Sequence, residues 1–147
     1  MKKPPEWATM LMEQVLKDEG LKIKPVLNWR DSKRSVWSSG QAWHPSKKAY
    51  YRYKDNRTTN GWDYKRVKYT ARYKITITAG SQSQDQRLVL LHELAHVICP
   101  KNVNHGAVFW RKAWELYKRY GVDLEYALNR EKGYRKESEI QYRKMFS

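Results

Sequence analysis

The histidine pair His92 and His96 constrains this chain more than any other feature, because the spacing of the two residues acquires a geometric meaning on a helix. The surrounding apolar stretch predicts a helix that Asp85 caps and that ends at Cys99, since Pro100 cannot continue it. Positions four apart on a helix are separated by about 40° around the axis and about 6 Å along it. We therefore predict that one helix presents two imidazoles to the same metal ion.

Two further residues complete a candidate catalytic zinc site. Glu93 leans toward the same cleft, and its carboxylate can take a proton from a water at the metal. His105 follows the helix stop closely enough for the chain to turn back and present a third imidazole. Three protein ligands with an open fourth position are typical of catalytic zinc, so we predict one Zn²⁺ ion. The lone Cys99 would close the site as a fourth ligand, but we interpret it as a small core residue.

The remaining pattern predicts a small α+β domain. Helices are expected over 4–19 and 107–120, with a short turn or helix over 124–128. Strands are expected over 21–27, 36–43, 49–53, 66–69 and 73–79, with a turn-rich loop over 56–61. The alternation over 73–79 is the clearest of these strand signals. We expect one domain over 1–129, with its core at about 21–120, followed by a basic tail over 130–147 that is solvated or frayed.

The length and charge of the chain narrow its function classes. Its 147 residues carry 30 Lys and Arg against 15 Asp and Glu, a formal charge of +15 that favours a polyanionic partner. No apolar run approaches the roughly 20 residues of a membrane-spanning helix, and no secretory signal is present. We expect an intracellular monomer, cytoplasmic or associated with the nucleoid or nucleus, that binds no membrane.

A basic and aromatic segment lies between His44 and Lys74, with ten basic residues against two acidic ones and seven interleaved Tyr and Trp. The basic residues are Lys47, Lys48, Arg52, Lys54, Arg57, Lys65, Arg66, Lys68, Arg72 and Lys74. Cations along a backbone with aromatic faces for the bases are typical of single-stranded nucleic-acid binding. The alternative is a twisted hairpin whose aromatic side chains pack inward.

The two histidine stretches, His92-Glu-Leu-Ala-His96 and His105-Gly-Ala-Val-Phe-Trp110, resemble the SprT-like family of zinc metalloproteases. The likeness extends upstream to 27–30, 38–42 and 75–78. It implies a minimal zincin-like fold: a small antiparallel or mixed sheet, an N-terminal helix, the H-E-x-x-H helix, and a following helix with the third ligand at its start. It also implies zinc ligation by His92, His96 and His105, with Glu93 as general base.

The resemblance further implies protein substrates, and proteolysis linked to DNA that includes removal of proteins crosslinked to it. We expect the strand at Ile75, Thr76, Ile77 and Thr78 to align the substrate by backbone pairing. One alternative is a basic nucleic-acid-binding module with a structural or vestigial zinc site. Another is a metallopeptidase of a different zincin branch, such as a repressor-cleaving enzyme.

Overall fold

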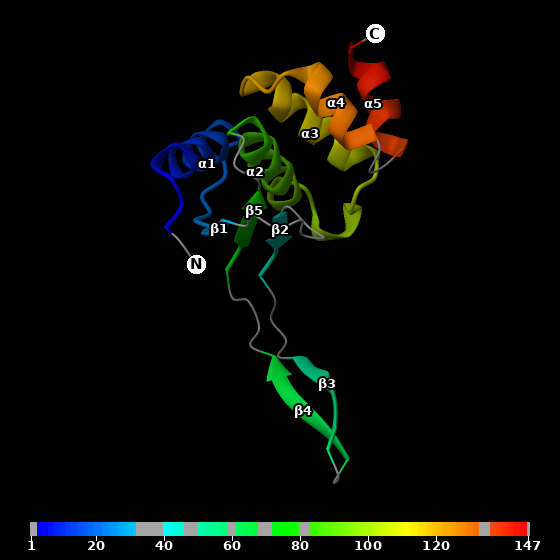
Figure 1. The fold of residues 1–147 in the computed structure, drawn as a ribbon. Helices are drawn as coiled ribbons and strands as arrows, with labels where there is room; N and C mark the ends of the chain where they lie inside the picture. The colour runs from blue at the N-terminus through cyan, green and yellow to red at the C-terminus, as the bar shows by residue number, and fades with distance from the viewer. Residues whose placement is uncertain are drawn as a thin grey trace.

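The computed structural model describes residues 3–31, 40–45, 50–58, 61–67, 72–79, 83–132 and 136–146, with the backbone alone of 31, 50–58, 61–67, 79, 83–84 and 132. These residues form five α-helices and a small three-stranded mixed sheet, so the predicted α+β class is confirmed. Helix α2 (Ser83–Ile98) lies between the sheet and the three C-terminal helices, and α1 (Glu6–Asp18) packs beside it (Figure 1). The histidine motif is therefore carried by the central helix of the fold.

The sheet has the strand order β1 (Val26–Asp31), β5 (Lys74–Ala79), β2 (Gly40–Trp43). Strand β5 confirms the strand predicted over 73–79, and it runs parallel to β1 and antiparallel to β2. The strand predicted over 21–27 is displaced, because pairing with β5 begins only at Val26, after a proline that has no N–H to donate. The part of the predicted strand 36–43 that precedes β2 lies outside the described residues.

Helix α2 is apolar on almost every side, which is typical of a helix enclosed by other elements. Leu88, Leu90, Leu91 and Leu94 are at most 1% exposed, and they belong to one core with the isoleucines of β5. The predicted helix is thus confirmed, but the predicted N-cap is wrong. The helix begins at Ser83, so Asp85 lies within its first turn, where a carboxylate is favoured by the helix dipole.

Helix α3 (Ala107–Arg119) confirms the helix predicted over 107–120. Its inner face is fully buried, at 0% exposure for Phe109, Trp110, Ala113, Trp114 and Tyr117. Each large apolar side chain buried in this way contributes about 1.5–3 kcal/mol to the free energy of unfolding. The chain leaves the helix at Gly121, whose φ of +80° is the left-handed conformation that glycine tolerates best. Helix α3 is therefore anchored along its whole length.

The expectation of a solvated or frayed end over 130–147 is wrong for the described residues. Helix α4 (Leu124–Lys132) is longer than the short turn or helix predicted over 124–128, and α5 (Lys136–Phe146) packs against both α3 and α4. The indole Nε1 of Trp114 donates a 2.9 Å hydrogen bond to the carbonyl of Ser138, and the rings of Trp114 and Tyr142 meet at 5.0 Å. The inner face of α5 includes buried polar residues, Ser138 and Gln141, so its hydrophobic periodicity is weak.

Strands β3 (Tyr50–Thr58) and β4 (Gly61–Val67) form a separate antiparallel pair, which Figure 1 shows apart from the helices. Both strands are longer than the stretches predicted over 49–53 and 66–69. The loop predicted over 56–61 is wrong at both ends, because Arg57 pairs with Trp62 and Thr58 with Gly61. Cross-strand pairing has here overridden the local preference of turn-forming residues.

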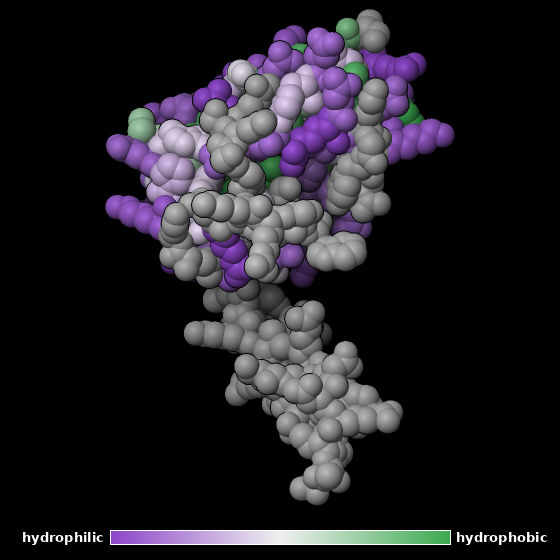
Figure 2. Space-filling model, in the orientation of Figure 1, coloured by the Kyte–Doolittle hydropathy of each residue, from purple (hydrophilic) through white to green (hydrophobic). Residues whose placement is uncertain are grey.

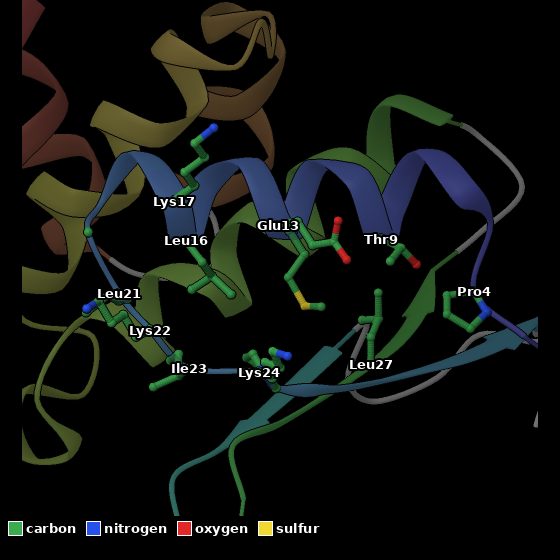
Figure 3. Close-up of a pocket in the computed structure, with 13 residues that line it drawn as sticks. Pro4, Thr9, Glu13, Leu16, Lys17, Leu21, Lys22, Ile23, Lys24 and Leu27 are labelled. Atoms are coloured by element: carbon green, nitrogen blue, oxygen red, sulfur yellow. The ribbon is translucent and has the colours of Figure 1, made fainter.

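Hydrophilic side chains cover most of the described surface in the view of Figure 2. A groove of about 840 Å³ lies between α1 and the segment that leads into β1 (Figure 3). Apolar side chains such as Leu16, Ile23 and Leu27 line it, together with Lys17 and Lys24. None of the described helices combines the length and the hydrophobicity that crossing a lipid bilayer requires.

Candidate metal centre

Three imidazoles converge at the C-terminal half of α2. His92 and His96 project from this helix, and His105 comes from the turn that precedes α3. The Nε2 atom of His105 lies 3.3 Å from Nε2 of His92 and 3.1 Å from Nε2 of His96. All three ligand atoms lie within 4.8 Å of one another, so the predicted cluster is present and could hold a metal ion.

The spacing of these nitrogens fits a tetrahedral metal site. Ligand atoms about 2.0–2.1 Å from a zinc ion lie about 3.3–3.4 Å apart, since a tetrahedron's edge is about 1.63 times its centre-to-corner distance. The separations of Nε2 of His105 from the other two nitrogens, 3.3 and 3.1 Å, are close to this value. A hydrogen bond alone accounts poorly for the arrangement, because the single ring N–H that Nε2 of His105 can carry faces two nitrogens at once. The donor set therefore suits a small divalent cation.

The backbone after α2 is shaped to return His105 to the helix. Pro100 ends the helix, a short 3₁₀ turn (Lys101–Val103, η1) follows, and the amide of Gly106 bonds the carbonyl of Val103 at 3.1 Å. Between them Asn104 has φ 46° and ψ −134°, a conformation that residues other than glycine rarely adopt. Such strain persists where the surroundings fix it, and here it lies immediately before the third histidine.

Aromatic packing fixes the orientation of the imidazoles. The buried ring of Phe109 stacks on His96 with centroids 4.1 Å apart, and it meets the edges of His92 and His105 at 4.9 and 5.0 Å. Burial, reinforced by the neighbouring histidines, lowers the pKa of His96 to about 3. That imidazole is therefore neutral near pH 7 and keeps a lone pair for a cation.

Glu93 is buried beside the cluster, with 6% of its surface exposed. Burial raises the pKa of its carboxyl group to about 7, although the neighbouring His92 opposes the shift. Strand β2 presses against the same side chain at Gly40, where an added Cβ would lie 2.7 Å from Cγ1 of Val89 and 2.9 Å from Cγ of Glu93. The predicted base is thus held between its own helix and the edge of the sheet.

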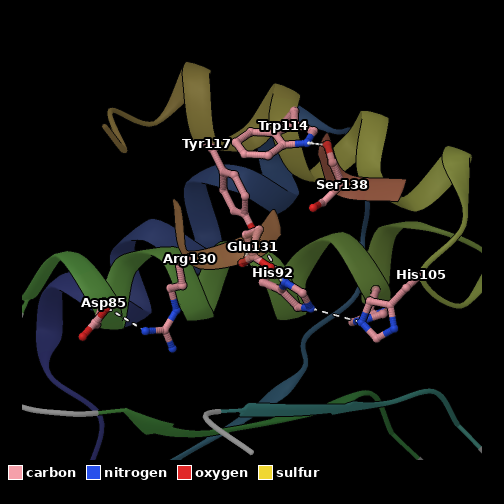
Figure 4. A network of polar contacts seen from close by, with 9 residues as sticks. Asp85, His92, His105, Trp114, Tyr117, Arg130, Glu131 and Ser138 are labelled. Atoms are coloured by element: carbon pink, nitrogen blue, oxygen red, sulfur yellow. Dashed lines mark hydrogen bonds and ion pairs between the residues drawn. The ribbon is translucent and has the colours of Figure 1, made fainter. Parts of the chain in front are cut away.

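Two residues that sequence patterns did not assign to the site lie behind His92 (Figure 4). Nδ1 of His92 lies 3.2 Å from the hydroxyl of Tyr117 and 3.4 Å from Oε1 of Glu131. The Tyr117 hydroxyl donates a 3.1 Å hydrogen bond to the same carboxylate oxygen. Burial lowers the pKa of His92, but the hydrogen bond and charge of Glu131 outweigh this effect and raise it.

The sequence carries different signals for these two residues. Tyr117 lies on the buried side of α3, and nothing in the helical periodicity distinguishes it from a core residue. Glu131 lies in a charged stretch, and it reaches His92 only through the packing of α4. A tertiary contact of this kind leaves no local spacing pattern.

Cys99 and the fourth histidine lie outside the cluster. Among the described residues, the group able to hold a metal comprises the three histidines without Cys99, whose side chain is buried. Nε2 of His44 lies 3.1 Å from the carbonyl oxygen of Cys99. This contact connects the segment after β2 to the end of α2. The interpretation of Cys99 as a core residue agrees with its 5% exposure.

The predicted substrate strand is not available over most of its length. Ile75, Thr76 and Ile77 pair with β1 on one side and with β2 on the other, because β5 is the central strand. A third backbone cannot pair with these residues, so the expectation for the strand at 75–78 is wrong there. Thr78 pairs with Arg30 of β1.

The predicted nucleic-acid contacts fall mostly outside what the structure describes. This holds for the side chains of Lys47, Lys48, Arg52, Lys54, Arg57, Lys65, Arg66 and Lys68. Of the other two, Arg72 donates a 3.0 Å hydrogen bond to the carbonyl of Lys24, and the ammonium of Lys74 lies 5.1 Å from the ring centre of Trp43. Both contacts lie within the domain.

The site thus combines three converging histidines, one buried carboxylate beside them, and a buried Tyr117–Glu131 pair behind His92. Its assignment depends on this geometry and on the resemblance of the sequence motifs. No protein-family model, curated protein or solved structure matches the chain.

Proposed function

We propose that this protein is a zinc-dependent endopeptidase of the SprT-like type. The observation that carries the proposal is the convergence of the Nε2 atoms of His92, His96 and His105, with the carboxylate of Glu93 on the next residue of the helix. The resemblance of both histidine stretches to the SprT-like motif supports zinc as the metal and peptide-bond hydrolysis as the reaction. Three protein ligands leave a coordination position for water or substrate.

The roles of the residues follow from their chemistry. His92, His96 and His105 would hold the zinc ion, which would supply Lewis acidity to polarise a water molecule and the carbonyl of the bond to be cleaved. Glu93 accepts the proton of the attacking water and passes it to the leaving amine. Its pKa of about 7 suits both steps, because a group that titrates near the working pH can accept and return a proton.

The edge strand β2 is the element best placed to align a peptide. It uses one edge to pair with β5, and Gly40 at its start lies against Glu93. The segment that follows it, at His44, is tied to the end of α2. A substrate that pairs with the outer edge of β2 would be held mainly by backbone hydrogen bonds, with little dependence on side chains.

The substitution Glu93→Gln tests the proposal. We expect this variant to retain zinc and to lose cleavage of casein by about 10²–10⁴-fold, because the amide cannot accept the proton. Metal content by mass spectrometry and release of casein fragments measure the two effects. The exposed Glu115→Gln, on α3, is the matched control and should cleave as the wild type does. Full activity of Glu93→Gln would remove this residue from its role.

The basic composition supports DNA-associated proteins as substrates. The charge of +15 and the ten basic residues between His44 and Lys74 favour a phosphate backbone as partner. Cleavage stimulated by single-stranded DNA would support this substrate class. Salt-sensitive DNA binding with no cleavage would favour instead a nucleic-acid-binding module with a structural metal site. Cleavage indifferent to DNA would favour a peptidase whose charge serves another purpose.

A further inference from the structure

The buried carboxylate of Glu131 lies directly behind the proposed metal site (Figure 4). Only 4% of Glu131 is exposed, and its Oε1 lies 3.4 Å from Nδ1 of His92. The hydroxyl of Tyr117 lies between the two groups: it donates to Glu131 at 3.1 Å and is 3.2 Å from Nδ1 of His92. Both acceptors therefore face the ring nitrogen that points away from the histidine cluster.

This contact selects one form of the imidazole. A proton on Nδ1 of His92 can be donated to Tyr117 or Glu131, which leaves the lone pair on Nε2. Nε2 is the atom that faces His105 across 3.3 Å. The pair behind His92 thus fixes both the tautomer and the ring rotation that a metal ligand needs.

A second, independent contact fixes the position of Glu131. The neighbouring Arg130 forms a 2.9 Å ion pair with Asp85, in the first turn of α2, and the hydroxyl of Tyr126 bonds the same carboxylate. Asp85 precedes His92 by about two helical turns. Helix α4 therefore contacts α2 at two places along that helix, at Asp85 and at His92.

The burial of the Glu131 carboxylate also links this residue to the metal site. A buried carboxylate is costly unless a hydrogen-bond donor or a positive charge compensates it. Tyr117 and His92 supply the donors. A divalent cation held by His92 would supply the positive charge.

From these contacts we propose that Glu131 is a positioning residue of the metal centre, which acts through His92 together with Tyr117. The inference rests on the proposed metal site and extends it to α4, so the C-terminal helices are part of the centre. Glu131 itself contacts neither the metal nor the substrate in this role.

Zinc titration against a chromophoric chelator tests the inference on the full chain, with Glu131→Gln, Tyr117→Phe and the control Glu125→Gln. Glu125 is an exposed glutamate in the first turn of the same helix. We expect Glu131→Gln to raise the Kd for Zn²⁺ by about 10–100-fold, the usual effect of losing such a partner. Tyr117→Phe should raise it less, because Glu131 can still accept from Nδ1, and Glu125→Gln should bind as the wild type does.

Nitrogen NMR of the zinc-loaded wild type reports which ring nitrogen of His92 carries the proton. A purely structural role of Glu131 would not determine this proton position, and the measurement does not require any variant to fold. We expect the ring proton of His92 on Nδ1, with a resonance that shifts in Tyr117→Phe. A wild-type proton on Nε2, or an unchanged Kd in Glu131→Gln, would overturn the inference. Neither measurement depends on cleavage, so the two proposals can fail separately. If Glu131→Gln weakens zinc binding but the wild type cleaves no casein, only the peptidase proposal is refuted.

Discussion

At Gly40 the chain approaches α2 so closely that even a methyl group has no space. The conflict is purely steric, because Gly40 is not among the glycines with positive φ. The atoms that would be displaced belong to Val89 and to the proposed base, Glu93. A glycine at this position therefore sets the distance between the sheet edge and the carboxylate of Glu93.

We expect Gly40→Ala to lower the free energy of unfolding by about 1–3 kcal/mol, the usual cost of overpacking. Cleavage should fall further than zinc affinity, because the substitution displaces Glu93 while the three ligands lie elsewhere. Urea unfolding, zinc titration and the casein assay separate these effects. Gln41→Ala, at the exposed neighbouring position, is the control. Wild-type cleavage by Gly40→Ala would show that Glu93 tolerates displacement.

The predictability of individual residues depends on whether their contacts are local. His92, His96 and Glu93 are predictable because one helix carries all three, and His105 because the chain turns back at Pro100. The structure confirms the convergence of the three histidines. Glu131 is not predictable, because its contact with His92 spans 39 positions of sequence and arises from helix packing.

Among the elements, α1 and α3 are joined at their C-terminal ends by charged and phenolic groups. The hydroxyl of Tyr120 donates a 2.6 Å hydrogen bond to Asp18, and Arg119 lies 3.6 Å from the same carboxylate. The hydrogen bond from Tyr120 is the largest of the effects that lower the pKa of Asp18 below its ordinary value of 3.8. Burial and the bond to Asp18 together raise the pKa of Tyr120 to about 12.

We expect Tyr120→Phe to raise the pKa of Asp18 toward 3.8 and to destabilise the protein at neutral pH. A carboxylate with a lowered pKa stabilises the fold above its ordinary value, and this contribution disappears as the pH falls through the lowered value. The difference in unfolding free energy between wild type and variant should therefore shrink below about pH 4. Urea unfolding over a pH series and an NMR titration of Asp18 measure both quantities.

The relative size of the two effects that lower the pKa of Asp18 provides an internal control. The charge of Arg119 lowers the pKa of Asp18 less than the hydrogen bond from Tyr120 does. Arg119→Gln should therefore raise the pKa of Asp18 by less than Tyr120→Phe. The reverse order would mean that charge, and not the hydrogen bond, dominates at this junction of α1 and α3.

Whole elements, like single residues, are predictable where their signal is local in the sequence and not where it depends on tertiary contacts. Strand β5 and helices α1 and α3 are predictable because their alternation or helical periodicity lies in consecutive residues. Helix α2 is predictable because its apolar stretch ends at Pro100. The start of β1 is not, because pairing with β5 determines where the strand begins. Helix α5 leaves only a weak helical pattern near Ile140, because the inner face that covers Trp114 includes polar residues, Ser138 and Gln141.

At the scale of the molecule, α2 connects the three-stranded sheet, α1 and α3 with the site. Its apolar sides contact the sheet, α1 and α3, and its histidines face the turn before α3. His105 is the one proposed ligand that α2 does not carry, so a bound metal would join α2 to the start of α3 across the strained residue Asn104. Metal binding and folding are coupled in such an arrangement, because the three ligands are assembled only in the folded chain.

We therefore expect zinc to stabilise the whole molecule and chelation to remove that stabilisation. A ligand that binds only the folded state adds about 4.1 kcal/mol to the free energy of unfolding at 1,000 times its Kd. His105→Ala should lose most of this increment, since it removes the only ligand outside α2. Urea unfolding at a series of free zinc concentrations measures the effect, on wild type and variant side by side.

His44→Ala is the matched control for this experiment. His44 bonds the carbonyl at the end of α2 but lies outside the three-histidine cluster. Its replacement should lower the stability of the metal-free protein while the increment from zinc stays at the wild-type value. An equal zinc increment in His105→Ala would mean that the ion binds without joining α2 to α3, and the proposed centre would then lose its third ligand. If His105→Ala loses the zinc increment and His44→Ala keeps it, the metal binds where the three nitrogens meet, because, of these two residues, only His105 belongs to that cluster.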